Sequence, residues 1–219
     1  MSRRNIYNFL RNLSNNNSKD WMDAHRDEYH AAKDEWLKTV QQLLDRLDRH
    51  DSRFGQMNPK KCILRITNNR MFHPDKPVYR DNFGFSPSDK DTPGIYVHIS
   101  PKESFVGGGV HRPDTGDLKK IRAAIDYDGG ELKKIINQAS FRAFYGGLSE
   151  DDQLLKTHPR TYYADHPHID LLRRKNFTAI RTLTQKEVIG DDFVDLVERA
   201  YVEIIPMLDY FKRALKMEA

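Results

Sequence analysis

The sequence contains a single cysteine, Cys62, so no internal disulfide can form. The chain is therefore typical of a protein from a reducing compartment such as the cytoplasm. Cys62 follows two lysines and begins the apolar run CILRI. A thiol in such a run is usually buried and inert, so we expect a structural cysteine rather than a reactive one.

Long hydrophobic runs are also missing, since the longest have four to five residues. A membrane-spanning helix needs about 20 apolar residues, so none is expected. The N-terminus MSRRNIYNFLRNLSNNN has no apolar core of a signal peptide, and we expect a cytoplasmic protein. No repeat, low-complexity tract or Gly/Ser/Pro-rich linker divides the chain, which predicts one domain over residues 1–219.

Motifs for metals and cofactors are absent from the sequence. No H-E-x-x-H pattern occurs, and the glycine run is not followed by the Gly-Lys-Ser/Thr of a P-loop. We therefore predict no metal site and no cofactor.

Charge is present but unevenly distributed. The net charge is only +4, which is small for a nucleic-acid-binding protein. Between Pro59 and Arg80 there are six basic residues against Asp75 alone, whereas Glu187–Ala219 has eight acidic residues against four basic ones. This pattern favours a polar molecule with one positive face.

Hydrophobic periodicity predicts an α+β fold. An apolar stripe at three- and four-residue steps predicts a helix, and short apolar runs between turn residues predict strands. The predicted helices are Ile6–Leu13, Lys19–Arg49, Asp114–Gly146 with a break at Gly129-Gly130, and Gly190–Lys216 with a kink at Pro206. The predicted strands are Cys62–Ile66, Phe83–Pro87, Gly94–Pro101, Ser104–Pro113 and Phe177–Thr184. Strands grouped between helices predict a mainly antiparallel sheet packed by a long N-terminal helix and a kinked C-terminal helix.

Four segments of the chain resemble one known family along nearly its whole length. They are FLRNLSNNNSKDWMDAHRDEY, KCILRITNNRMFHPDKPVYRDNFG, GIYVHISPKESFVGGGVHRP and YYADHPHIDLLRRKNF, in this order. Together they resemble the Domain of Unknown Function 2461 family. The resemblance implies one cytoplasmic domain. It transfers no activity, cofactor or catalytic residue, because none is established for the family.

The segment from Arg65 to Gly84 carries the main functional hypothesis. If CILRI is a strand, Arg65 shares a face with Ile63 and is partly buried, and a buried guanidinium needs an acceptor. Asp75 cannot neutralise all the nearby bases. Convergent Arg and Lys with a Tyr hydroxyl suit a phosphate or carboxylate. The predicted ligand-binding residues are Arg65, Arg70, Lys76 and Tyr79.

The alternative is that acids of this chain, including those of the C-terminal helix, neutralise these bases. Structural ion networks have the same composition as a ligand site. The sequence leaves both readings open.

The glycine run FVGGGVH is a candidate wall of the same groove. Glycine lets another backbone or a ligand approach closely, so a β-bulge or a strand crossing is the competing reading. The candidate wall residues are His98, Gly107, Gly108, Gly109 and His166. His73 and His111 are the weak candidates for a catalytic acid or base, because imidazole titrates near neutrality.

Two further motifs have simpler explanations. In DHPHID, Asp165 before Pro167 is typical of a helix N-cap, and the spacing matches no zinc pattern. The run LLRRK, with Arg173, Arg174 and Lys175, is a basic helical face that would extend a nucleic-acid footprint.

The sequence therefore predicts an anion-binding protein. A phosphorylated or carboxylated small molecule is the expected ligand, and the sequence does not decide whether the protein is an enzyme. The alternatives are a nucleic-acid-binding module and an interaction scaffold without a small ligand.

Overall fold

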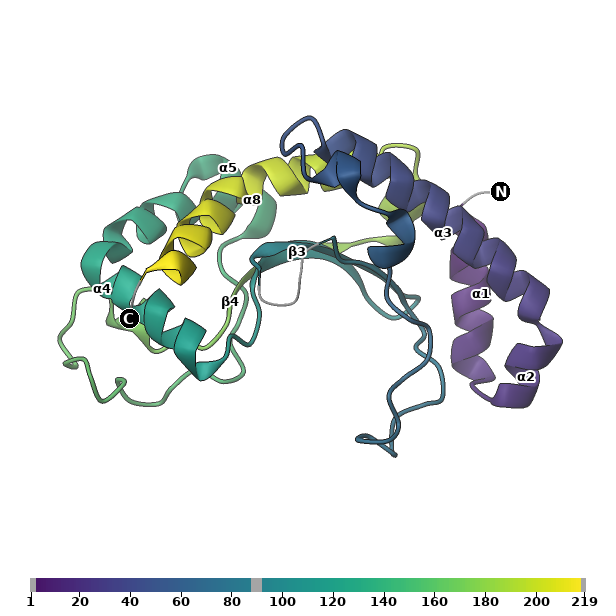
Figure 1. The fold of residues 1–219 in the computed structure, drawn as a ribbon, viewed down its shortest axis with the longest axis horizontal. Coiled ribbons are helices and arrows are strands. Elements are labelled where there is room, and N and C mark those ends of the chain that lie inside the picture. The colour runs from purple at the N-terminus through teal and green to yellow at the C-terminus, as the bar shows by residue number, and fades with distance from the viewer. Residues whose placement is uncertain (1–2, 88–91, 218–219) are drawn as a thin grey trace. The chain divides into compact units, whose positions relative to one another are not determined.

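A computed structural model describes residues 3–87 and 92–217. In these ranges the chain forms eight α-helices, two 3-10 turns and one four-stranded antiparallel sheet, which confirms the α+β fold (Figure 1). Its residues divide into two compact units. Unit 1 comprises residues 3–87, 96–106 and 182–199, and unit 2 comprises residues 92–95, 107–181 and 200–217. Strands β2, β3 and β4 and helix α8 each contribute residues to both units.

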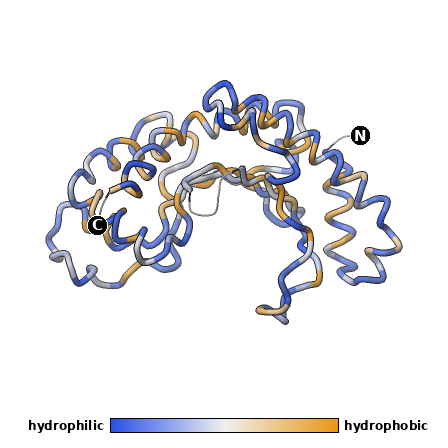
Figure 2. Tube along the Cα trace, viewed as in Figure 1, coloured by the Kyte–Doolittle hydropathy of each residue, from blue (hydrophilic) through white to orange (hydrophobic). Residues whose placement is uncertain are grey.

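Unit 1 begins with three helices, α1 (Arg3–Asn15), α2 (Lys19–Ala24) and α3 (Arg26–Leu47). Helix α1 packs against α3, and each presents an apolar stripe to the other (Figure 2). On α3 the fully buried Trp36 donates a hydrogen bond from its indole N–H to the carbonyl of Gly84 at 3.3 Å. This bond fixes the helix against strand β1 (Phe83–Phe85).

The single helix predicted over Lys19–Arg49 is interrupted at His25. The break arises because the His25 backbone leaves the helical region, with φ −114° and ψ 28°. Its ring stacks on Trp21 at 4.1 Å, and its Nδ1 lies 2.8 Å from the Trp21 carbonyl oxygen, which ends α2. Ser18 caps the start of α2, within the polar break where a cap is expected.

The sheet has the strand order β1-β2-β3-β4. The other strands are β2 (Gly94–Ile99), β3 (Ser104–Val110) and β4 (Phe177–Leu183). The predicted alternation of β2 is confirmed, because Ile95, Val97 and Ile99 are buried while Tyr96 and His98 are half-buried. The register pairs Phe83 with Ile99 and Phe85 with Val97, so β1 and β2 bury the same face.

Unit 2 contains α4 (Thr115–Ile136), α5 (Ala139–Tyr145), α6 (Ile169–Leu172) and the second half of α8 (Phe193–Lys216). The predicted break in α4 lies one residue early, at Asp128, whose φ of −147° is not helical. Asp114 caps α4, because its side chain accepts a hydrogen bond from the Asp117 N–H. Helix α8 runs through Pro206, and α7 (Gln185–Ile189) precedes it in unit 1. None of the described helices has the length and apolar character needed to cross a membrane.

The three glycines of β3 are required by close backbone packing. A Cβ on Gly107, Gly108 or Gly109 would lie 2.4, 2.3 or 2.1 Å from the carbonyl oxygens of Ala179, Gly94 and Phe177, respectively. These oxygens belong to the neighbouring strands β2 and β4. The structural reading of the glycine run, a close strand crossing, therefore accounts for all three residues.

The carboxylate of Asp151 holds the loop before β4 against the start of that strand. It accepts hydrogen bonds from the backbone N–H groups of Lys175 at 2.6 Å and Asn176 at 3.0 Å. The side-chain amide of Asn176 donates another at 2.8 Å. Partial burial raises the pKa of Asp151, but these hydrogen bonds stabilise the carboxylate more strongly and bring the pKa to about 2.

We predict that Gly108→Ala lowers the free energy of unfolding by about 1–3 kcal/mol, because a backbone carbonyl cannot move aside. Gly130→Ala is the matched control, since its Cβ would lie 3.5 Å from the nearest atom, on an exposed helical position. It should leave the free energy of unfolding unchanged or raise it by up to about 1 kcal/mol. Chemical denaturation measures both, and an equal effect of the two changes would contradict the strand-crossing explanation.

Asp151 also makes stability depend on pH. Its folded-state pKa lies below the ordinary value of 3.8, so the stabilisation is fully present above pH 3.8 and is lost as the pH falls toward 2. Asp151→Asn should therefore be less stable than the unmodified protein at about pH 6, and the difference should narrow at about pH 2.5. Urea denaturation at both pH values tests this, and a difference independent of pH would contradict it.

Candidate functional site

The segment Cys62–Thr67 of unit 1 runs antiparallel to residues 79–86 without forming the continuous strand that the sequence predicts. Only two isolated bridges connect the segments, Ile63 with Phe85 and Thr67 with Tyr79. Five residues, 80–84, therefore lie opposite only three, 64–66, and this bulge interrupts the ladder. The sheet consequently ends in an irregular edge at residues 63–67.

The side chain of Arg65 is exposed, so the prediction of a partly buried guanidinium is wrong. The reason is that Arg65 lies on the irregular edge rather than in a central strand. The Arg65 residue nevertheless lines a cavity of about 390 Å³.

This cavity, which we call the basic cavity, lies in unit 1 between two walls. Helices α2 and α3 form one wall, and the second wall comes from the edge segment and the start of β1. The described residues that line it are Met22, Arg26, Tyr29, Lys33, Trp36, Lys60, Ile63, Leu64, Arg65, Ile66, Thr67, Tyr79 and Phe83. Its lining thus combines aromatic and aliphatic side chains with four basic ones.

The four basic residues of the cavity are Arg26, Lys33, Lys60 and Arg65, and no acidic residue lines it. Arg26 forms an exposed ion pair with Asp23, and the Lys33 ammonium lies 5.9 Å from the centre of the Tyr29 ring. Within the described chain, neither Lys60 nor Arg65 has an ion-pair partner. The cavity therefore carries positive charge that the surrounding chain does not neutralise.

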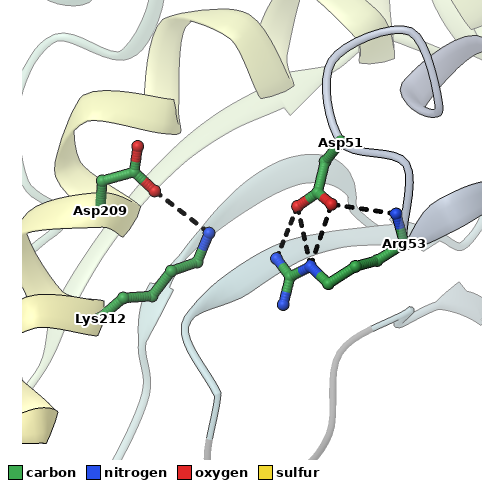
Figure 3. A network of polar contacts seen from close by, with 4 residues as sticks. All are labelled: Asp51, Arg53, Asp209 and Lys212. Atoms are coloured by element: carbon green, nitrogen blue, oxygen red, sulfur yellow. Dashed lines mark hydrogen bonds and ion pairs between the residues drawn. The ribbon is translucent and has the colours of Figure 1, made fainter.

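Several cations elsewhere in the described chain form ion pairs with nearby acids. Arg53 and Lys212 pair with Asp51 at 2.6 Å and with Asp209 at 3.2 Å, respectively (Figure 3). Two of the α8 acids that were alternative partners of the basic stripe, Asp195 and Glu198, are engaged elsewhere in unit 1. Asp195 and Glu198 both accept from Arg46, and Glu198 also contacts His50 at 2.9 Å.

A second cavity, of about 330 Å³, illustrates the contrast. It is lined by the acids Asp45, Asp191 and Asp195 together with Arg46 and Arg49. Its charges are mixed, and its Arg46 is paired with an acid of its own wall. This second cavity therefore does not call for an outside anion.

The backbone of Tyr79 is fixed by the side chain of Asn17. The Asn17 amide donates to the Tyr79 carbonyl at 2.9 Å, and its oxygen accepts from the Tyr79 N–H at 2.9 Å. The side chain of Tyr79 is buried against the basic cavity. Two of the predicted ligand-binding residues, Arg65 and Tyr79, are thus brought together.

Arg70 and Lys76, the other two predicted ligand-binding residues, lie apart from the basic cavity. They occupy an exposed loop between Thr67 and Tyr79, which extends away from α3 (Figure 1). The guanidinium of Arg70 donates to the carbonyl of Pro74, in the same loop, at 3.2 Å. His73 is exposed in this loop too. Neither Arg70, Lys76 nor His73 lines the cavity, and a role for them in binding stays a prediction.

The candidate wall residues also lie outside the lining of the basic cavity. In unit 1, the His98 ring stacks on Phe105 with centroids 4.9 Å apart, and burial lowers the pKa of His98. Gly107–Gly109, His111 and His166 belong to unit 2. His111 is exposed, whereas His166 Nε2 lies 3.0 Å from Asp126 Oδ1 and its Nδ1 accepts from the His168 N–H.

The predicted helix cap at Asp165 is wrong. Helix α6 begins at Ile169, and its N-cap residue is His168, so Asp165 lies four residues before the helix. Nor does the described chain bring three or more His, Cys, Asp or Glu side chains into an arrangement that could hold a metal ion.

The sequence reasoning missed Arg26, Lys33 and Lys60. Arg26, Tyr29, Lys33 and Trp36 follow one another at steps of three, four and three residues, so they share one face of α3. Arg26 before Tyr29 and Lys33 between Tyr29 and Trp36 indicate that the apolar stripe of this helix is open to solvent at its N-terminal end. Lys60 has no comparable signal, because its position depends on the 3-10 turn Pro59–Lys61.

Comparison with known proteins identifies the family without an activity. No curated protein and no solved structure matches the chain. Residues 5–210 match the model of a family described as "Conserved hypothetical protein (DUF2461)". The match covers most of the 219 residues, and the chain therefore belongs to the DUF2461 family.

Proposed function

We propose that this protein binds an organic anion in the basic cavity. The observation that carries the proposal is the charge of the lining, four bases and no acid. Two of these bases, Lys60 and Arg65, have no ion-pair partner in the described chain, and like charges gathered without partners repel one another and are stabilised by a counter-charge from outside. Both walls contribute cations, Arg26 and Lys33 from α3 and Lys60 and Arg65 from the edge side.

The chemistry of the lining favours a ligand that has an apolar part as well as a negative group. Arg65 supplies a planar fork of donors for a carboxylate or phosphate, and the lysines supply point charges. Tyr29, Trp36 and Phe83 add aromatic surface to the same cavity. A carboxylated or phosphorylated molecule with a hydrophobic body would contact both kinds of surface.

Binding is favoured over catalysis by what lines the cavity. Among the described lining residues there is no His, Asp, Glu or Cys, the side chains that most often transfer protons near neutral pH. The catalytic candidates His73 and His111 are both exposed and outside the lining. In an enzymatic role, the proton-transferring groups of the described lining would be its lysines and tyrosines.

The nucleic-acid alternative draws less support from the LLRRK segment than its sequence indicates. Arg173 donates to the carbonyl of Leu155 at 2.7 Å, and Arg174 donates to those of Ser149 and Asn176. Both side chains are half-buried and brace loops of unit 2. They are therefore poorly placed to contact phosphates.

The buried thiol of Cys62 is compatible with the cytoplasmic location that we propose.

We predict that citrate, pyrophosphate or a fatty-acid carboxylate raises the melting temperature of the protein in a saturable way. Arg65→Gln should weaken the binding of the stabilising anion about tenfold or more, because a charge-assisted hydrogen bond is lost. Thermal-shift titration at moderate salt measures both effects.

The neighbouring lysines provide the matched control. Lys60 lines the basic cavity and Lys61 does not, although both are exposed. Lys60→Gln should weaken anion binding, whereas Lys61→Gln should change it little. Equal effects of the two substitutions would show diffuse surface attraction, and the absence of any stabilising anion would reject the proposal.

A further inference from the structure

The irregular edge of the sheet has backbone groups without a hydrogen bond, on residues that line the basic cavity. Leu64 donates to Gly84 at 3.3 Å, and Asn68 donates to Val78 at 3.1 Å, so the even-numbered residues face the neighbouring segment. Ile63 and Thr67 occupy the non-hydrogen-bonded positions of their bridges, and their N–H and C=O groups point the other way. In the described chain, the backbone groups of Ile63, Arg65 and Thr67 make no hydrogen bond.

These three residues are accessible as well as unpaired. Ile63 is half-buried, Arg65 and Thr67 are exposed, and all three line the basic cavity. Consecutive odd-numbered residues of an extended segment offer donors and acceptors in alternation, as the free edge of a sheet does. Ile63 to Thr67 spans about 13 Å of extended chain, enough to pair with a peptide of about five residues.

The opposite wall gives this edge the shape of a peptide groove. Arg26, Tyr29, Lys33 and Trp36 of α3 face the cavity across from the edge segment. A groove between an edge strand and a helix holds an extended peptide through main-chain hydrogen bonds, and its pockets select alternate side chains. The cations on both walls select acidic side chains or a terminal carboxylate.

We propose that the ligand of the basic cavity is an acidic peptide segment that adds to the sheet as a further strand along Ile63–Thr67. This inference rests on the proposed function, because it takes the anion to be the carboxylates of a peptide. A small anion would accept from N–H groups and leave the edge carbonyls unpaired. An extended peptide pairs with both kinds of group.

Pairing of this edge with a second copy of itself is disfavoured by charge. Such a pairing would bring the Lys60 and Arg65 side chains of the two copies together along one edge. Like charges facing one another across a strand pair are destabilising, and charged edges are a common protection against self-association.

The test uses the full-length protein and the peptide Glu-Thr-Glu-Val-Glu-Thr-Glu-amide with a fluorescent label on its N-terminus. Binding is measured as the fluorescence anisotropy of the labelled peptide. Two versions carry N-methyl groups on alternate residues, either the odd or the even ones. A bound strand hydrogen-bonds to the protein along only one of its two edges, so only alternate N–H groups are needed. One version should therefore have a Kd at least about tenfold higher, and the other should bind nearly as well as the parent. A version with Gln in place of Glu should bind weakly.

Amide exchange measured by NMR locates the contact. Peptide binding should slow the exchange of the Ile63, Arg65 and Thr67 amides, and should leave that of Leu64, already bonded to Gly84, little changed. Arg65→Gln should raise the peptide Kd about tenfold, and Lys61→Gln, outside the described lining, should leave it nearly unchanged.

The outcomes separate this inference from the proposed function. If both N-methylated peptides bind as well as the parent, or if only citrate or pyrophosphate binds, strand addition is overturned and anion binding stands. If neither the peptide nor a small anion binds in a manner that depends on Arg65, both are overturned. Selective loss with one methylated version, together with protection of the three amides, supports strand addition.

Discussion

The incomplete pairing between Cys62–Thr67 and residues 79–86 is the feature on which the candidate site depends. Ile63, Arg65 and Thr67 face away from residues 79–86, so their backbone groups have no hydrogen-bond partner in the described chain. The bulge opposite residues 64–66 makes this edge irregular, and the edge lines the basic cavity together with α3. Trp36 of α3 donates a hydrogen bond to the Gly84 carbonyl and so anchors this helix against β1.

The electrostatics of the cavity distinguish it from the rest of the protein. Some cations elsewhere form exposed ion pairs at little gain in stability, whereas Lys60 and Arg65 have no such partner in the described chain and lie together at one cavity without an acidic residue in its described lining. Four cations around one cavity repel one another, and a ligand with negative charge relieves that repulsion. In the proposed function, anion binding and a small cost in stability would have the same origin, as is common at binding sites.

The sequence predicted the parts of the fold that local periodicity determines. The alternation in GIYVHIS, the stripe of α3 and the break beside Gly129 follow from side-chain spacing, and they were confirmed within a residue or two. The bulge after Cys62 and the break at His25 depend on tertiary contacts that no local pattern records. The same limit explains why the sequence pointed to Arg65 and Tyr79, which line the basic cavity, but not to Lys60. The position of Lys60 depends on the 3-10 turn Pro59–Lys61. A capping box at Thr184 and Glu187, which starts α7, was a readable signal that was missed.

The central claim is that Lys60 and Arg65 of the basic cavity have no counter-charge within the described chain. The most direct measurement is the free energy of unfolding of the double variant Lys60→Gln/Arg65→Gln in a zwitterionic buffer at low ionic strength. The account predicts that the variant is at least as stable as the unmodified protein, and that any gain disappears at about 1 M salt, where repulsion is screened. A loss of about 1 kcal/mol or more at low salt would show that these side chains are stabilised by internal partners, and would contradict the account.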